Sequence, residues 1–93
     1  ENMIDPVELA KGVIARMERT NEKIIYIGSV LDLLPSGKYY TPWACSNVTE
    51  EEAEADEEWW EAFDTELAKH NAWSETYEGD PLDILVVRED ADN

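Results

Sequence analysis

The sequence predicts an α+β fold, in which a small antiparallel sheet of about four strands carries two helices packed on one face. Two segments, near residues 6–19 and 49–70, begin with helix-capping residues and repeat apolar residues at helical spacing. Short β-branched and aromatic segments stand between and after them, separated by turn residues. This order is typical of helices packed on an antiparallel sheet. A length of 93 residues predicts one domain over residues 1–93, frayed over residues 1–4 and 89–93.

The first helix is expected from Pro6 to about Arg19. Asp5 is its expected N-cap, and Pro6 suits the first helical position, where a backbone N–H is not needed. Thr20 and Asn21 are expected to end the helix. The residues expected to face the core recur at helical spacing: Val7, Ala10, Val13, Ile14 and Met17.

The segment after this helix, Lys23–Gly28, is β-branched and aromatic and is predicted to be a strand. Ser29–Leu34 has two interpretations: a short helix capped by Ser29, or a second extended piece. The extended form is favoured, because apolar pairs flank the Pro-Ser-Gly-Lys turn at residues 35–38 as two arms of a hairpin would. Tyr39–Ala44 is then the returning strand.

The longest helix is expected from Thr49 to about His70. Thr49 and Glu52 have the spacing of a capping box, which satisfies two backbone donors at the helix start. Ten acidic residues and no basic residue lie between positions 50 and 66. Because like charges four residues apart each cost about 0.2–0.5 kcal/mol, packing of an apolar stripe must stabilise this helix. That stripe consists of Trp59, Trp60, Phe63 and Leu67, with one tryptophan expected in the core and the other at its margin.

The last third of the chain predicts two further strands. Trp73–Tyr77 alternates apolar and polar residues as a half-buried strand does. A turn cluster follows at residues 78–81. Leu82–Val87 is apolar enough to be the central strand of the sheet.

The negative charge of the chain is concentrated in its C-terminal part. The formal net charge is −16; residues 1–38 contribute −1, and residues 39–93 contribute −15. This charge disfavours direct binding to nucleic acid or to an anionic membrane and favours a basic partner. No secretory signal and no apolar run near 18 residues is present, so no membrane association is expected. A single cysteine, Cys45, forms no disulfide within the chain, which predicts a cytoplasmic protein.

No catalytic or metal-binding pattern stands out, so we expect no enzymatic activity, cofactor or metal. Residues 35–38 resemble the end of a phosphate-binding loop, but the earlier glycine is missing and Tyr39 replaces the magnesium-binding Ser or Thr. Cys45 and His70 are the one thiol–imidazole pair that the chain can offer. The sequence specifies neither an orienting group nor an oxyanion hole for them.

Two blocks of sequence, PSGKYYTPWACSNV at residues 35–48 and GDPLDILV at residues 79–86, carry a resemblance. They resemble segments of small uncharacterised acidic proteins of phages, prophages and plasmids, and the resemblance covers about residues 24–88. It implies a mobile-element origin and favours an inhibitor of host defence, since such elements encode many small acidic blockers of nucleases. It carries over no functional residue.

The leading hypothesis is an acidic, non-enzymatic binding protein that mimics DNA and blocks the basic nucleic-acid groove of a host enzyme, such as a restriction or CRISPR nuclease. Ten acids over 17 helical residues give one charge per ~2.5 Å, against one per ~1.7 Å along B-DNA. The residues expected to contact this partner are Glu51, Glu54, Asp56, Glu57, Glu58, Trp59, Trp60, Glu61 and Asp64.

Two other hypotheses remain open. In the first, the acidic helix only keeps a small domain soluble, and an aromatic pocket binds a small ligand. The residues expected to line that pocket are Tyr39, Tyr40, Trp43 and Trp73. In the second, the chain forms a homodimer through an open edge of its sheet.

Overall fold

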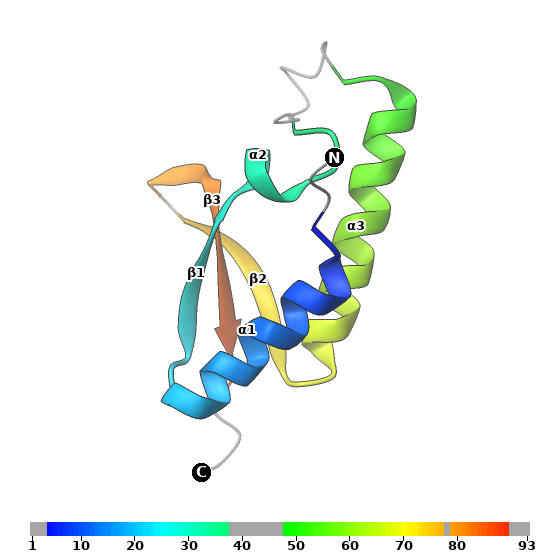
Figure 1. The fold of residues 1–93 in the computed structure, drawn as a ribbon. Helices are drawn as coiled ribbons and strands as arrows, with labels where there is room; N and C mark the ends of the chain where they lie inside the picture. Colours follow the sequence, from blue (N-terminus) through cyan, green and yellow to red (C-terminus); the bar gives the residue numbers. More distant parts are fainter. Residues whose placement is uncertain (1–3, 38–47, 78, 90–93) are drawn as a thin grey trace.

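The structure is a computed structural model, and it describes residues 4–37, 48–77 and 79–89. Within these residues the chain forms three helices and one antiparallel sheet of three strands (Figure 1). The α+β class is therefore confirmed. In chain order the elements are α1 (Pro6–Thr20), β1 (Ile24–Ser29), α2 (Val30–Leu33), α3 (Glu50–Ala68), β2 (Ala72–Tyr77) and β3 (Asp80–Arg88).

Helix α1 begins and ends where the sequence predicts. The side chain of Asp5 accepts a hydrogen bond from the backbone N–H of Val7 at 3.0 Å, and Pro6 is the first helical residue. Asn21 follows the helix in the left-handed conformation, with a φ of 62°. Asparagine tolerates this conformation better than most residues, because its short polar side chain can bond locally.

Strand β3 lies at the centre of the sheet, as predicted for the most apolar segment. The strand order is β1-β3-β2, and both neighbours run antiparallel to β3. Tyr26 of β1 and Glu75 of β2 both pair with Leu85. The register of β1 shifts after Tyr26, at a bulge where Gly28 has a φ of 126° that an L side chain rarely adopts.

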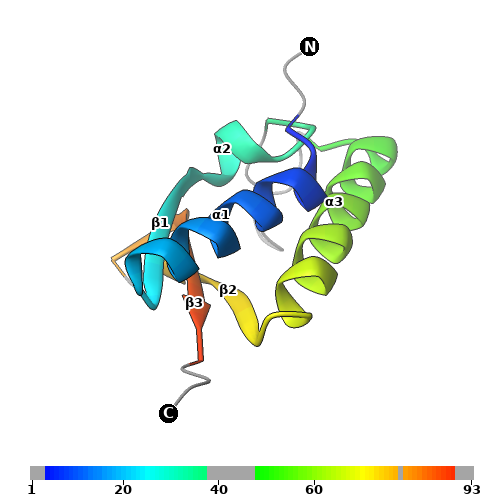
Figure 2. The same ribbon diagram turned by 60° about the horizontal axis from the view of Figure 1, so that its bottom comes forward.

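Helices α1 and α3 cover one face of this sheet, as Figures 1 and 2 show from two directions. Most of the apolar stripe predicted for each helix is buried against the inward residues of the strands, whereas Val7 and Trp60 are half-buried. The buried core contains Ala10, Val13, Ile14 and Met17 of α1, Ile25 of β1, Val30 and Leu33 of α2, Trp59, Phe63 and Leu67 of α3, Ala72 of β2, and Ile84 and Val86 of β3.

The structure differs from the predicted sheet in two details. The extended form favoured for Ser29–Leu34 is wrong, because Val30–Leu33 is the short helix α2. Its N-cap is Ser29, whose hydroxyl accepts a hydrogen bond from the N–H of Leu31 at 3.1 Å. The helix turns Val30 and Leu33 together into the core, which an alternating strand cannot do. The count of about four strands is not confirmed: the described residues hold three, and the predicted strand Tyr39–Ala44 lies outside them.

Candidate partner-binding surface

The start of α3 is fixed by the predicted capping box. The backbone N–H of Glu52 donates to the hydroxyl of Thr49 at 3.1 Å, and the N–H of Thr49 donates to the carboxylate of Glu52 at 3.0 Å. Glu50 and Glu51 share this first turn, where the positive end of the helix dipole favours negative charge. The local sequence therefore sets the first residue of α3.

The inward side of α3 is held by its aromatic residues. Trp59 is 5% exposed, and its indole N–H donates to the backbone carbonyl of Ile4 at 2.8 Å. The ring of Trp59 stacks on that of Phe63, with centroids 5.1 Å apart. Trp60 is half-buried at the margin of the core, with its ring edge-on to Trp59 at 5.2 Å. The division between a core tryptophan and a marginal one is confirmed.

Asp56 is also on the inward side, and this corrects its predicted place on the partner-binding surface. Its side chain accepts hydrogen bonds from the backbone N–H of Ser36 at 3.1 Å and from the Ser36 hydroxyl at 2.7 Å. The residue is 7% exposed. Asp56 precedes Trp59 by three positions and so shares its side of the helix. It ties the segment after α2 to α3, and neither Asp56 nor Trp59 is available to a partner.

The outward side of α3 carries a row of glutamates that we call the acidic face. All are exposed, and none makes an ion pair with a Lys, Arg or His in residues 4–37, 48–77 and 79–89. Glu50 belongs to this row by its position, although it was not predicted to bind the partner. The acidic face consists of Glu50, Glu51, Glu54, Glu57, Glu58 and Glu61.

Asp64 lies at the border of the acidic face, on the side of β2. Its carboxylate accepts a hydrogen bond from the hydroxyl of Ser74 at 3.0 Å. Partial burial against the strand raises the pKa of Asp64 above its ordinary value, and the hydrogen bond from Ser74 opposes that rise. Asp64 remains exposed and has no ion pair in the described part of the chain, so it adds a carboxylate at the border of the acidic face.

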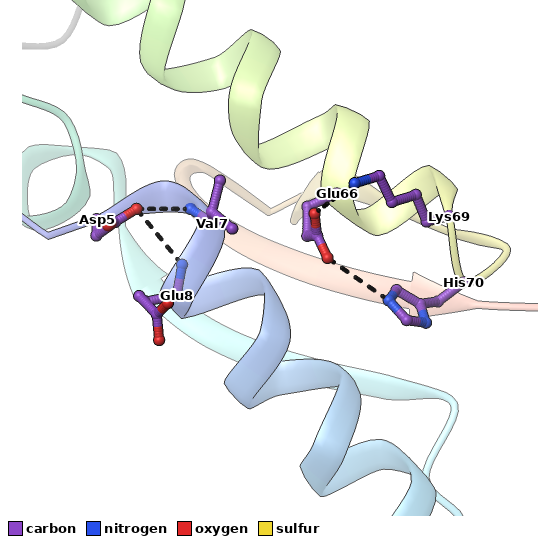
Figure 3. A network of polar contacts seen from close by, with 6 residues as sticks. All are labelled: Asp5, Val7, Glu8, Glu66, Lys69 and His70. Atoms are coloured by element: carbon purple, nitrogen blue, oxygen red, sulfur yellow. Dashed lines mark hydrogen bonds and ion pairs between the residues drawn. The ribbon is translucent and has the colours of Figure 1, made fainter.

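On its other side the acidic face borders an open groove between α1 and α3, with a volume of about 330 Å³. Val7 lines it from α1, and Glu58, Glu61 and Glu66 line it from α3. Glu66 is buried, and Figure 3 shows its carboxylate directed to the neighbouring side chains of Lys69 and His70. Lys69 Nζ lies 3.1 Å from one oxygen of Glu66, and His70 Nε2 lies 3.8 Å from the other. Glu66 therefore belongs to a local network and is not part of the acidic face.

Replacing Glu66 with glutamine should remove a contribution to stability that depends on pH. The hydrogen bond from Lys69 lowers the pKa of Glu66 in the folded chain below its ordinary 4.5, although burial opposes the effect. Such a carboxyl stabilises the fold above that ordinary value, and the contribution is lost as pH falls through the folded pKa. Thermal melts should therefore show a Tm difference between wild type and Glu66→Gln at neutral pH that shrinks below about pH 4.5.

The matched control for this measurement is Glu61→Gln, which removes an exposed carboxyl from the same helix and the same groove. Its Tm difference from wild type should change less over the same range. If the Glu66→Gln difference were as large in acid as at neutral pH, the contact with Lys69 would not be the source of the stabilisation.

The residues predicted for a small-ligand pocket are not brought together in the described part of the chain. Tyr39, Tyr40 and Trp43 lie outside the described residues. Trp73 is on the face of the sheet that points away from the helices, and it is 41% exposed. Sequence reasoning missed the apolar neighbours of Trp73 on that face, which are Ile24, Tyr26, Leu85 and Val87. Alternation along β1 and β3 predicts which residues share a face of the sheet. It does not predict which face is exposed, because both faces of these strands are apolar.

The described residues also bear on metal binding and on membrane insertion. No group of three or more His, Cys, Asp or Glu side chains among them is arranged to hold a metal ion. None of the helices within those ranges combines the length and apolar character needed to cross a bilayer. The chain matches no protein-family model, and no curated protein or solved structure matches it.

Proposed function

We propose that this chain is a non-enzymatic binding protein whose acidic face docks on a basic protein surface. The partner that fits best is a host nucleic-acid enzyme, such as a restriction or CRISPR nuclease, whose nucleic-acid groove the acidic face would block. A phage or other mobile element is the origin that fits this role. The observation that carries the proposal is the row of six exposed glutamates on α3 without a cationic partner in the described part of the chain.

The spacing of these charges supports a nucleic-acid groove as the target. From Glu50 to Glu61 there are eleven helical steps, which span roughly 16 Å at a rise of 1.5 Å. Six carboxylates over that length give about one charge per 3 Å, close to the spacing of about 3.4 Å along one strand of B-DNA. A Lys/Arg track that binds one strand would therefore meet a similar number of negative charges per unit length on the acidic face.

The folded chain retains repulsion along this row, which also favours a partner. Glu50–Glu54, Glu54–Glu58 and Glu57–Glu61 are like-charge pairs four residues apart, each of which costs about 0.2–0.5 kcal/mol. The aromatic core beneath α3 offsets this cost in the free chain. On a basic partner these carboxylates would be attracted to cationic side chains. The resulting gain in binding free energy would fall steeply as salt screens the charges.

The triple variant Glu54→Lys, Glu58→Lys and Glu61→Lys should abolish capture of partners while the fold is retained. We would immobilise the chain, expose it to lysate of a bacterial host at low and high salt, and elute with duplex DNA. Proteins captured by wild type should include nucleic-acid enzymes, be released by salt and by DNA, and bind the triple variant more than tenfold more weakly. Circular dichroism would check that both chains are folded.

A second triple variant controls for net charge. Glu8→Lys, Asp32→Lys and Glu89→Lys change the charge by the same amount at exposed positions outside α3. This control should capture the same proteins as wild type. Equal capture by the α3 variant and by wild type would remove the acidic face from the interface, and release that is insensitive to DNA would exclude a nucleic-acid groove as its target.

A further inference from the structure

The face of the sheet opposite the helices is lined mainly by apolar side chains, and we call it the open face. Alternation along the strands places it on the other side from the buried residues Ile25, Ile84 and Val86. In the described part of the chain, all three helices contribute to the opposite, buried side. The open face comprises Ile24 and Tyr26 of β1, Asp83, Leu85 and Val87 of β3, and Trp73, Glu75 and Tyr77 of β2.

The strand register arranges these side chains in two rows. Ile24, Val87 and Trp73 form one row, and Tyr26, Leu85 and Glu75 form the next. The outer members are well exposed: Ile24 at 58%, Tyr26 at 57% and Trp73 at 41%. Large apolar side chains directly opposite one another make a continuous patch rather than scattered exposure.

The charged groups on this face are both acidic. One oxygen of Glu75, Oε2, accepts a hydrogen bond from the indole N–H of Trp73 at 2.7 Å. Its other oxygen has no partner among the described residues. Asp83 accepts from the hydroxyl of Tyr26 at 3.2 Å. None of the open-face positions in the described strands is Lys or Arg, so within the described residues these carboxylates have no ion pair.

A second copy of this chain fits the open face poorly. Its four well-exposed apolar side chains, Ile24, Tyr26, Trp73 and Tyr77, offer roughly 100 Å² each, or about 400 Å² in all, against about 800 Å² per partner in a standard interface. Pairing two open faces would also enclose Glu75 and Asp83 of both copies in one interface, where no open-face position in the described strands is Lys or Arg. Single-stranded nucleic acid stacks on exposed aromatic rings, but such sites also need a basic groove.

We propose that the open face binds a protein segment that carries arginine beside aliphatic side chains. The aliphatic groups would cover the row of Ile24, Val87 and Trp73. The planar guanidinium would lie against the indole of Trp73 and donate to the free oxygen of Glu75, combining a cation–π contact with a charge-assisted hydrogen bond. Arginine suits this position better than lysine, because its flat, weakly hydrated fork both stacks and donates. The open face lies on a different side of the molecule from the acidic face.

A defined peptide tests the proposal on the full chain. We would titrate isotope-labelled protein with acetyl-Leu-Arg-Ile-Arg-Leu-amide and follow the backbone amides and the Trp73 indole N–H by two-dimensional NMR. Salt of about 0.3 M would weaken diffuse attraction to the acidic face. Signals of Trp73 and of open-face residues should shift, and Glu75→Gln should weaken binding about tenfold, which corresponds to about 1.4 kcal/mol. Glu8→Gln, which removes an exposed carboxyl on α1, should leave binding unchanged.

Each alternative occupant gives a result that would overturn the proposal. Equal shifts with a peptide in which citrulline replaces arginine would show that the contact is only apolar. Shifts confined to α3 would place the peptide on the acidic face instead. Sedimentation that shows a dimer dissociated by Tyr26→Ala would assign the open face to a second copy. Open-face shifts with an oligonucleotide would assign it to nucleic acid.

The substitution Glu75→Gln keeps an acceptor for the Trp73 indole. Melting curves of Glu75→Gln and Tyr26→Ala would verify that both variants fold.

Discussion

Replacing Trp59 with alanine should lower the free energy of unfolding by about 3–5 kcal/mol, the range for truncating a large buried aromatic side chain. Trp59 is 5% exposed and stacks on Phe63, which is fully buried. The substitution removes both the packing and the hydrogen bond from the indole to the carbonyl of Ile4. Since small domains are stable by only about 5–15 kcal/mol, urea denaturation should show a large part of the stability lost.

The neighbouring tryptophan is the matched control. Trp60→Ala removes the same side chain from the same helix, but Trp60 is half-buried, so we expect a loss of roughly 1–2 kcal/mol. Trp59→Phe keeps an aromatic ring without the indole N–H and should fall between wild type and Trp59→Ala. Equal losses for Trp59→Ala and Trp60→Ala would contradict the orientation of α3, in which Trp59 faces the core and Trp60 lies at its margin.

The helices could be predicted because their signals are local. Thr49 with Glu52, and Asp5 with Pro6, fix two helix starts through backbone donors a few residues away. The apolar stripe of each helix then selects its buried side. The short helix α2 is the less favoured of the two interpretations of Ser29–Leu34, because four residues give no periodicity. Its stabilisation comes from Val30 and Leu33 entering a core built by distant segments.

The candidate surfaces were harder to predict, because they depend on what covers each element. The outward glutamates of α3 follow from the aromatic stripe opposite them. The open face does not: Ile24 and Ile25 are equally apolar, yet one is 58% exposed and the other 4% exposed. Only the position of the helices decides which side of β1 is buried. Asp56 is expected on the partner-binding surface as one of the acids of α3, although its three-residue spacing from Trp59 places it inward.

Asp56→Ala should lower the free energy of unfolding by about 2–3 kcal/mol, since a hydrogen bond to a charged group contributes about 1.5–3 kcal/mol. The loss is reduced because removing one acid relieves some repulsion along α3. The two hydrogen bonds from Ser36 span twenty residues of sequence and fix the segment after α2 against α3. Asp56→Asn keeps one acceptor for the Ser36 N–H, so chemical denaturation should show a smaller loss.

A double-mutant cycle with Ser36→Ala separates the side-chain contact from the other effects of losing Asp56. We expect a coupling energy of roughly 0.5–3 kcal/mol, because the Ser36 hydroxyl and the Asp56 carboxylate are 2.7 Å apart. A coupling near zero would contradict the contact. Folded Asp56→Ala protein should also capture partners as wild type does, whereas reversal of the adjacent Glu54 and Glu58 should not. That contrast would separate a carboxylate that holds α3 in place from those that α3 presents to a partner.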